Sequence, residues 1–179
     1  MKYVSDSTIL MKQVSVRATL MKQNGYTLIE ILVVITIMTT LFSFGYANFR
    51  DFSRRQTLQG AVKQVQGSLR KAQQSALSGV KPDDPKCNNP QTLNGYGFKI
   101  ESSLSQYSVF ADCSGGNAQI GSLVDLPSGI TASTPLNPII FKVLGSGTNI
   151  VGGDNVITFT QTVGGKTSTI SVGPGGDIK

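Results

Sequence analysis

The chain has 179 residues, of which 39% are hydrophobic and only 15% charged, and its formal net charge is +6. This length is sufficient for one ordinary domain and an additional segment. The sequence contains two cysteines and no histidine, which excludes histidine-dependent catalytic triads and the common zinc sites. We therefore expect no enzymatic activity, no cofactor and no metal ion.

The basic residues are concentrated in the first half of the sequence. Four of them precede residue 25, and six more lie between Arg50 and Lys71, where Asp51 is the only acidic residue. From residue 81 onward, six lysines face seven acidic residues. A positive charge confined to one stem points only weakly to a DNA-binding surface, so we do not favour DNA as a partner.

Residues 27–49 are apolar apart from Glu30, Asn48 and a few threonines and serines. At a rise of about 1.5 Å per residue, a helix of this length spans roughly 34 Å, enough for the hydrocarbon core of a membrane. A secretory signal peptide usually has a shorter apolar core and a small-residue cleavage site after it. The stretch therefore predicts a single membrane-spanning helix over residues 26–50. The simplest alternative is a plain signal anchor.

Residues 25–30 read GYTLIE and lie between a short basic leader and the apolar stretch. This arrangement resembles the class III signal of type IV pilins and of the pseudopilins of type II secretion systems. In that family, prepilin peptidase cuts after the glycine and methylates the new N-terminal amine. The resemblance implies cleavage between Gly25 and Tyr26, N-methylation of Tyr26, and a role in assembly for Glu30. Tyr26 departs from the usual phenylalanine but is still aromatic.

The resemblance assigns residues 1–25 to a leader peptide. Residues 21–25, MKQNG, are themselves a complete leader of the short kind. Met1, Met11 and Met21 are each followed by lysine, so the sequence leaves three alternative starts open.

Glu30 is a carboxylate in a stretch bound for lipid, where an unpaired charge is costly. The resemblance implies that the new amine at Tyr26 of one subunit pairs with Glu30 of a neighbour in a helical filament. Each buried charge would then find its partner only on assembly. The alternative is a carboxylate that stays protonated or lies near the lipid headgroups.

A second apolar pattern predicts that the helix continues to about residue 78. Its spacings of 4, 3, 4, 3 and 4 place one apolar stripe on a helix. The stripe consists of Leu58, Val62, Val65, Leu69, Ala72 and Ala76. Gly79 supplies a stop signal and Pro82 opposes continuation. We expect this half of the helix to lie on a sheet rather than in a coiled coil.

The remaining sequence predicts a loop and a β-rich region. Residues 80–95 have loop composition, and five later runs have the composition of strands. These runs are residues 96–101, 107–112, 139–144, 156–162 and 167–172. The last two runs, joined around residues 163–166, are expected to form a hairpin.

Cys87 and Cys113 are the only cysteines. Cys87 lies in the predicted loop and Cys113 at the end of a predicted strand. In an exported head we expect them to form a disulfide, because such bonds persist in oxidising compartments. Two reduced, buried cysteines are the alternative.

Together these patterns predict an α+β fold in which a long N-terminal helix packs on an antiparallel β-rich head. We expect a leader over residues 1–25, a membrane or filament-core helix over 26–50, and a globular head over 51–179. Within the head, the amphipathic helix covers residues 51–79 and the β-rich part residues 96–179. The head, with segments such as GYGFKI and YSVFADC, also resembles minor pilins and pseudopilins of the H type.

The resemblance implies a filament subunit, either a minor pilin or a pseudopilin. Alternatives are a DNA-uptake minor pilin, a major pilin, and a membrane-anchored binding module that never polymerises. The implied partners are prepilin peptidase, other pilin subunits, an inner-membrane assembly platform, and membrane lipid before assembly. The expected location is the cytoplasmic (inner) membrane, crossed once with the head outside, and then a periplasmic or extracellular filament.

Overall fold

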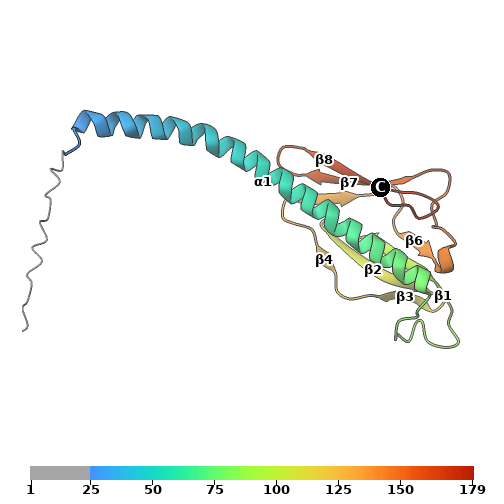
Figure 1. Cartoon of the computed structure of the whole chain (residues 1–179). Helices are drawn as coiled ribbons and strands as arrows, with labels where there is room; N and C mark the ends of the chain where they lie inside the picture. The colour runs from blue at the N-terminus through green and yellow to red at the C-terminus, as the bar shows by residue number, and fades with distance from the viewer. Residues whose placement is uncertain (1–24) are drawn as a thin grey trace, which may run out of the picture. The chain divides into compact units, whose positions relative to one another are not determined.

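A computed structural model of the protein describes residues 25–179 (Figure 1). These residues divide into two compact units, one ending at Phe44 and one comprising Gly45–Lys179. Helix α1, Leu28–Ser78, begins in the first unit and ends in the second. All strands belong to the second unit and pair in antiparallel fashion. The predicted α+β class is confirmed.

The second half of α1 contributes one face to the hydrophobic core of the head. The residues of this face that are less than 5% exposed are Leu58, Ala61, Val65, Leu69, Ala72 and Ala76. The helix ends after Ser78, where Gly79 adopts a φ of +63° and its N–H donates to the carbonyl oxygen of Ser75 at 3.2 Å. Glycine is favoured at such a left-handed C-terminal cap. The predicted amphipathic stripe and the predicted end of the helix are therefore both confirmed.

The larger sheet has five strands. Four of them lie in the order β3-β2-β1-β6, and the fifth, β4, also pairs with β2. The strands are β1 (Leu93–Ile100), β2 (Gln106–Cys113), β3 (Gly116–Gln119), β4 (Val124–Asp125) and β6 (Ile139–Lys142). Phe98 pairs with Val109 and Ile100 with Tyr107, and these side chains belong to or pack against the core. The rings of Phe98 and Tyr107 lie 5.2 Å apart between centroids.

The smaller sheet has three strands in the order β5-β7-β8. They are β5 (Ile130–Ser133), β7 (Asn155–Gln161) and β8 (Thr167–Val172), and a short 3₁₀ turn, η1 (Val143–Gly145), follows β6. Thr160 pairs with Thr167, which confirms the predicted hairpin. The residues Ile157, Phe159 and Ile170 of this sheet are buried.

Several elements differ from the prediction. Strand β1 begins at Leu93, so the predicted loop over residues 80–95 extends too far. Gly95 lies inside this strand, where only glycine fits, because a Cβ at this position would collide with the carbonyl oxygen of Phe141 on the neighbouring strand. Strand β6 ends at Lys142, two residues before the predicted end, where Leu144 adopts a left-handed φ of +55° in η1. Strands β3, β4 and β5 were not predicted.

Three asparagine side chains hold the segments that lie between the strands of the two sheets. Asn137 accepts the N–H of Ile100 at 3.0 Å and donates to the carbonyl oxygen of the same residue at 2.7 Å. Asn155 forms the same kind of pair with Leu136, at 3.1 Å in both directions. Asn149 bonds to backbone groups of the segment around β6 in the same way. A carboxamide offers both a donor and an acceptor, so it replaces strand pairing where the chain leaves the sheet.

Candidate functional site

Helix α1 begins with a capped first turn. The N–H of Glu30 donates to the hydroxyl oxygen of Thr27 at 3.3 Å, and the N–H of Ile31 donates to the Thr27 carbonyl oxygen at 3.2 Å. Threonine at this position satisfies a backbone donor that has no partner within the helix. The sequence Thr-x-x-Glu is also the pattern of a capping box. Glu30 therefore lies in the first turn, where the helix dipole favours a negative charge.

Gly25 and Tyr26 precede the helix and have no regular secondary structure. Both are exposed, Tyr26 to 76%, and a Cβ placed on Gly25 would meet no atom within 4 Å. An exposed peptide bond outside regular structure is accessible to a protease. The two predicted processing residues and Glu30 thus lie within six consecutive residues at the helix start. The remaining leader, including Met1, Met11 and Met21, lies outside the described residues.

The first part of α1 exposes apolar side chains on all sides. Leu28 is 83% exposed, Ile35 59% and Phe42 79%. The most apolar window of this helix has a mean hydropathy of 2.1, and none of it is buried within the chain. Within residues 25–179, α1 is the one helix long and apolar enough to cross a membrane. A helix that is apolar all round requires cover from lipid or from other protein.

The threonines of this apolar stretch do not leave hydroxyl donors without partners. The hydroxyl of Thr36 donates to the carbonyl oxygen of Leu32 at 2.7 Å, and that of Thr39 donates to Ile35 at 2.6 Å. Thr40 bonds to the backbone in the same manner. Such bonds to the preceding turn satisfy a polar group without water. The stretch is therefore compatible with lipid despite its hydroxyl groups.

Charged side chains make contacts just after the apolar stretch ends. The guanidinium carbon of Arg50 lies 5.7 Å from the centroid of the Tyr46 ring, a cation–π distance. Asp51 pairs with Lys166 at 2.8 Å, and this hydrogen bond and charge hold the pKa of the Asp51 carboxyl below its usual value. Tyrosine and arginine are the residue types that anchor a helix at a membrane surface. Neither contact was predicted from the sequence.

The hairpin of β7 and β8 holds the helix just after this point. Lys166 lies in the turn between the two strands, and Gln161 at the end of β7 donates to the carbonyl oxygen of Arg54 at 3.3 Å. Gln161 is only 6% exposed, so the hydrogen bond from its side-chain amide to the helix is shielded from water. The hairpin therefore fixes the first turns of α1 that belong to the head.

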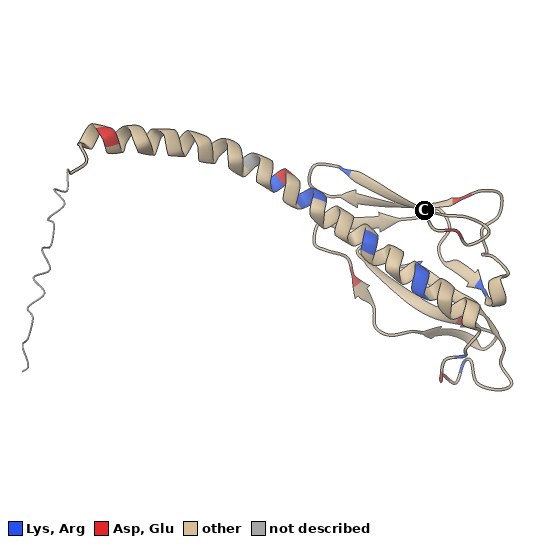
Figure 2. Cartoon of the chain, in the orientation of Figure 1, with Lys and Arg blue, Asp and Glu red and all other residues tan. Residues whose placement is uncertain are grey.

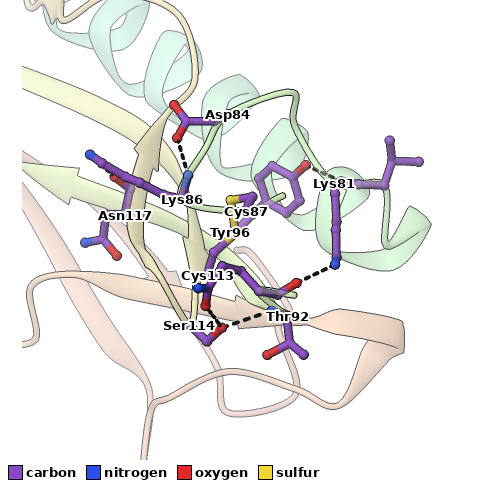
Figure 3. The surroundings of a disulfide bond; sticks show 11 residues. Lys81, Asp84, Lys86, Cys87, Thr92, Tyr96, Cys113, Ser114 and Asn117 are labelled. Atoms are coloured by element: carbon purple, nitrogen blue, oxygen red, sulfur yellow. Dashed lines mark hydrogen bonds between the residues drawn. A yellow bond between two sulfur atoms is a disulfide. The ribbon is translucent and has the colours of Figure 1, made fainter. Parts of the chain in front are cut away.

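Cys87 and Cys113 form a disulfide in the structure, with a Cα–Cα distance of 5.3 Å (Figure 3). It joins the loop after α1 to the end of β2, and both residues are buried. Hydrogen bonds on either side hold the same loop. The hydroxyl of Tyr96 donates to the carbonyl oxygen of Val80 at 2.5 Å, and burial raises the pKa of this phenol. The loop is therefore attached to the larger sheet at more than one point.

Lysine side chains complete this attachment. Lys86 donates to the carbonyl oxygen of Asn117 on β3 at 2.9 Å, and Lys81 donates to that of Gln91 at 2.5 Å (Figure 3). The ammonium groups of both lysines thus help to hold the loop in place. No sequence pattern predicts these two contacts, because the partners are backbone atoms of other segments.

The start of the helix also matches a known sequence family. Residues 20–46 match the family model described as the prokaryotic N-terminal methylation motif. The chain carries this motif. The methylation motif includes Gly25, Tyr26 and Glu30 together with most of the exposed apolar stretch, and it supports the predicted likeness to pilin-like proteins. Comparison with curated proteins and with solved structures finds no match.

The methylation motif does not extend to the β-rich head. The likeness of the head to H-type minor pilins thus rests on the sequence segments alone. Of the residues predicted to be functional, the structure groups Gly25, Tyr26 and Glu30 at the helix start and joins the two cysteines. It adds Thr27, whose capping role was recognisable from the Thr-x-x-Glu spacing.

Proposed function

We propose that the chain is the precursor of a filament subunit, a minor pilin or pseudopilin of a type IV pilus or a type II secretion system. One observation carries this proposal. The methylation motif covers the start of a helix whose apolar side chains are exposed on every side. Such a helix needs lipid cover before assembly and protein cover after it. A structural subunit of this kind needs no catalytic site.

Processing starts at Gly25. We propose that prepilin peptidase removes residues 1–25 on the cytoplasmic side of the inner membrane and methylates the amine of Tyr26. The exposed, irregular backbone before Leu28 supports this, since a protease binds its substrate in extended form. Glycine at the cut leaves room that any side chain would fill. Residues 26–50 then form the membrane-spanning and later filament-core helix, with residues 51–179 as the head outside.

Cleavage places a positive charge at the start of α1. The dipole of the helix also has its positive end there, so an ammonium at Tyr26 is unfavourable without an anion nearby. We propose that Glu30 of a neighbouring subunit supplies this anion in the filament. In a site of low dielectric such a pair is strongly attractive, whereas either charge alone is heavily penalised. Glu30 would therefore set the register between an incoming subunit and those already assembled by the inner-membrane platform.

The head has the features of an exported domain. The Cys87–Cys113 disulfide fits the oxidising periplasm or the outside of the cell. From residue 81 onward, acidic residues outnumber lysines by seven to six. A DNA-uptake subunit therefore remains the less favoured alternative.

The proposal is tested on filaments sheared from cells that express the chain. Quantitative mass spectrometry should find the subunit in them at a small fraction of the most abundant pilin. A dominant share would instead identify a major pilin. If the chain enters neither a sheared filament nor a periplasmic one and remains wholly in the membrane, it is an anchored module and the proposal fails.

A further inference from the structure

Helix α1 presents a second face in the head, opposite its buried stripe. We call it the basic helix face. It consists of Gly60, Lys63, Gln64, Gly67, Arg70 and Lys71, which recur at the spacing of one side of a helix and are all exposed. The buried residues Leu58 to Ala76 occupy the other side. No segment among residues 25–179 therefore covers this face.

No acidic side chain in the part of the chain that the structure describes pairs with the positive charges of the basic helix face. No acidic residue occurs between Phe52 and Pro82. Figure 2 shows basic positions, in blue, along this part of α1. Among residues 25–179, none of Lys63, Arg70 and Lys71 takes part in an ion pair. Positive charges that share one side of a helix repel each other, so an external anion would stabilise the face.

Gly60 and Gly67 independently indicate that another chain contacts this face. Glycine within a helix is destabilising relative to alanine. A Cβ at Gly60 or Gly67 would meet no atom within 4 Å, so no contact with the described residues requires glycine there. Glycines on one side of a helix allow another backbone to approach closely. Their seven-residue spacing places both at the centre of the basic helix face.

We propose that the basic helix face binds a carboxylate-bearing surface of a neighbouring filament subunit. This inference rests on the proposed function. Complementary charge would orient an incoming subunit, and the glycines would let its backbone come close. The face lies on the same helix as the apolar stretch that other subunits are proposed to cover.

The composition of the face favours a protein partner over a nucleic acid. Proteins that bind single-stranded nucleic acid combine positive charge with aromatic side chains on which bases stack. Residues 53–78 contain no aromatic residue. The face also holds only three positive charges among its six residues, whereas a strong nucleic-acid site neutralises many phosphates.

Carbodiimide cross-linking of sheared filaments tests the inference. This reagent joins a lysine amine to a carboxylate in contact with it and adds no spacer. Mass spectrometry should find Lys63 or Lys71 joined to an aspartate or glutamate of another subunit. The double variant Lys63→Arg, Lys71→Arg is the matched control: it keeps the charge, so it should enter filaments normally and lose these cross-links.

Reversing the charge of the face provides an independent test of the inference. The double variant Lys63→Glu, Lys71→Glu should be processed normally but enter filaments about tenfold less, because like charges then face each other. Lys142→Glu, an exposed change on β6, should have no such effect. Normal incorporation of the double reversal, or filaments without cross-links from Lys63 and Lys71, would overturn the inference while leaving the proposed function intact.

Two further results would overturn the proposed partner of the basic helix face. If the wild-type chain is absent from filaments altogether, the proposed function fails and this inference fails with it. If the full chain in detergent binds a DNA oligonucleotide at physiological salt, and the double reversal abolishes that binding, the face is a nucleic-acid site. That result would overturn the protein partner.

Discussion

Helix α1 has two apolar stretches, and the side chains are exposed in the first and buried in the second. Between Leu28 and Phe49, the large apolar side chains are 48–83% exposed. Between Leu58 and Ala76, six apolar side chains are at most 4% exposed. The sheets of the head cover the second stretch, and no segment among residues 25–179 covers the first. The difference shows that hydrophobicity alone does not assign a helix to a core, because the partner strands decide it.

The difference also separates two kinds of stability. Apolar residues of the second stretch contribute to the folding of the chain itself, because they leave water when the head forms. Those of the first stretch leave water only in lipid or among other subunits. Substitutions in the first stretch should therefore alter assembly, and substitutions in the second should alter folding.

The largest effect is expected at Glu30, the one charged residue of the first stretch. Glu30→Leu should leave cleavage and membrane insertion largely intact, since it removes a carboxylate from the apolar span. Incorporation into filaments should fall by about 100-fold or more, because the neighbour's amine is left buried without a counter-charge. The measurement is the ratio of processed subunit in sheared filaments to that in membranes.

Two further substitutions separate charge from capping at this position. Glu30→Gln keeps the pattern of the capping box and removes the charge, so it should fail nearly as severely as leucine. Glu30→Asp keeps the charge on a shorter side chain and should be intermediate. Normal incorporation of Glu30→Leu would show that the carboxylate is not the register contact.

The comparison between the two stretches is tested directly by a pair of identical substitutions. Leu69→Ala, at a site with no exposure, should lower the free energy of unfolding of the head by about 2–5 kcal/mol. Leu41→Ala, at a site 64% exposed, should leave it unchanged. Urea denaturation of the full-length protein in detergent, followed by near-UV circular dichroism, provides the measurement. Equal losses at both sites would contradict the separation.

The disulfide should stabilise the head alone. Replacing both Cys87 and Cys113 with alanine should lower its free energy of unfolding by about 3 kcal/mol, mainly by releasing the unfolded chain. Processing and membrane insertion should not change. In the secreted, non-reduced protein, a thiol reagent should label neither cysteine; complete labelling of both would refute the bond.

The smallest effect is expected at the ion pair between Asp51 and Lys166. Because the pKa of Asp51 is lowered in the folded state, its contribution is present above the unfolded value of 3.8 and is lost as the pH falls below it. Asp51→Asn should therefore reduce the melting temperature slightly at neutral pH and not at strongly acidic pH. Thermal unfolding of both proteins across this range measures the difference. A difference that stays constant with pH would show that the charge of Asp51 contributes nothing.

Much of the fold was predictable because it depends on periodicity. The stripe from Leu58 to Ala76 and the stop at Gly79 define the head helix, and the alternation in residues 156–172 defines the hairpin. The missed strands β3, β4 and β5 are two to four residues long and contain few strand-forming side chains. They form because their longer neighbours offer backbone partners, which a local pattern does not report.

The candidate site was predictable to the extent that it is local. Gly25, Tyr26 and Glu30 belong to one continuous motif, so no folding is needed to bring them together. The contacts that hold the head to the helix are different. Lys166 reaches Asp51 across 115 positions of sequence, and Gln161 reaches Arg54 across 107. Such pairs arise from the topology of the hairpin and carry no sequence signal of their own.

The mass of the mature N-terminus tests the central claim most directly. In cells with active prepilin peptidase, the N-terminal peptide should begin at Tyr26 and carry one added methyl group. Gly25→Ala should retain the leader, because its Cβ obstructs the protease, while Gly45→Ala within the exposed helix should be processed normally. An intact leader on the wild-type chain in those cells would contradict the account.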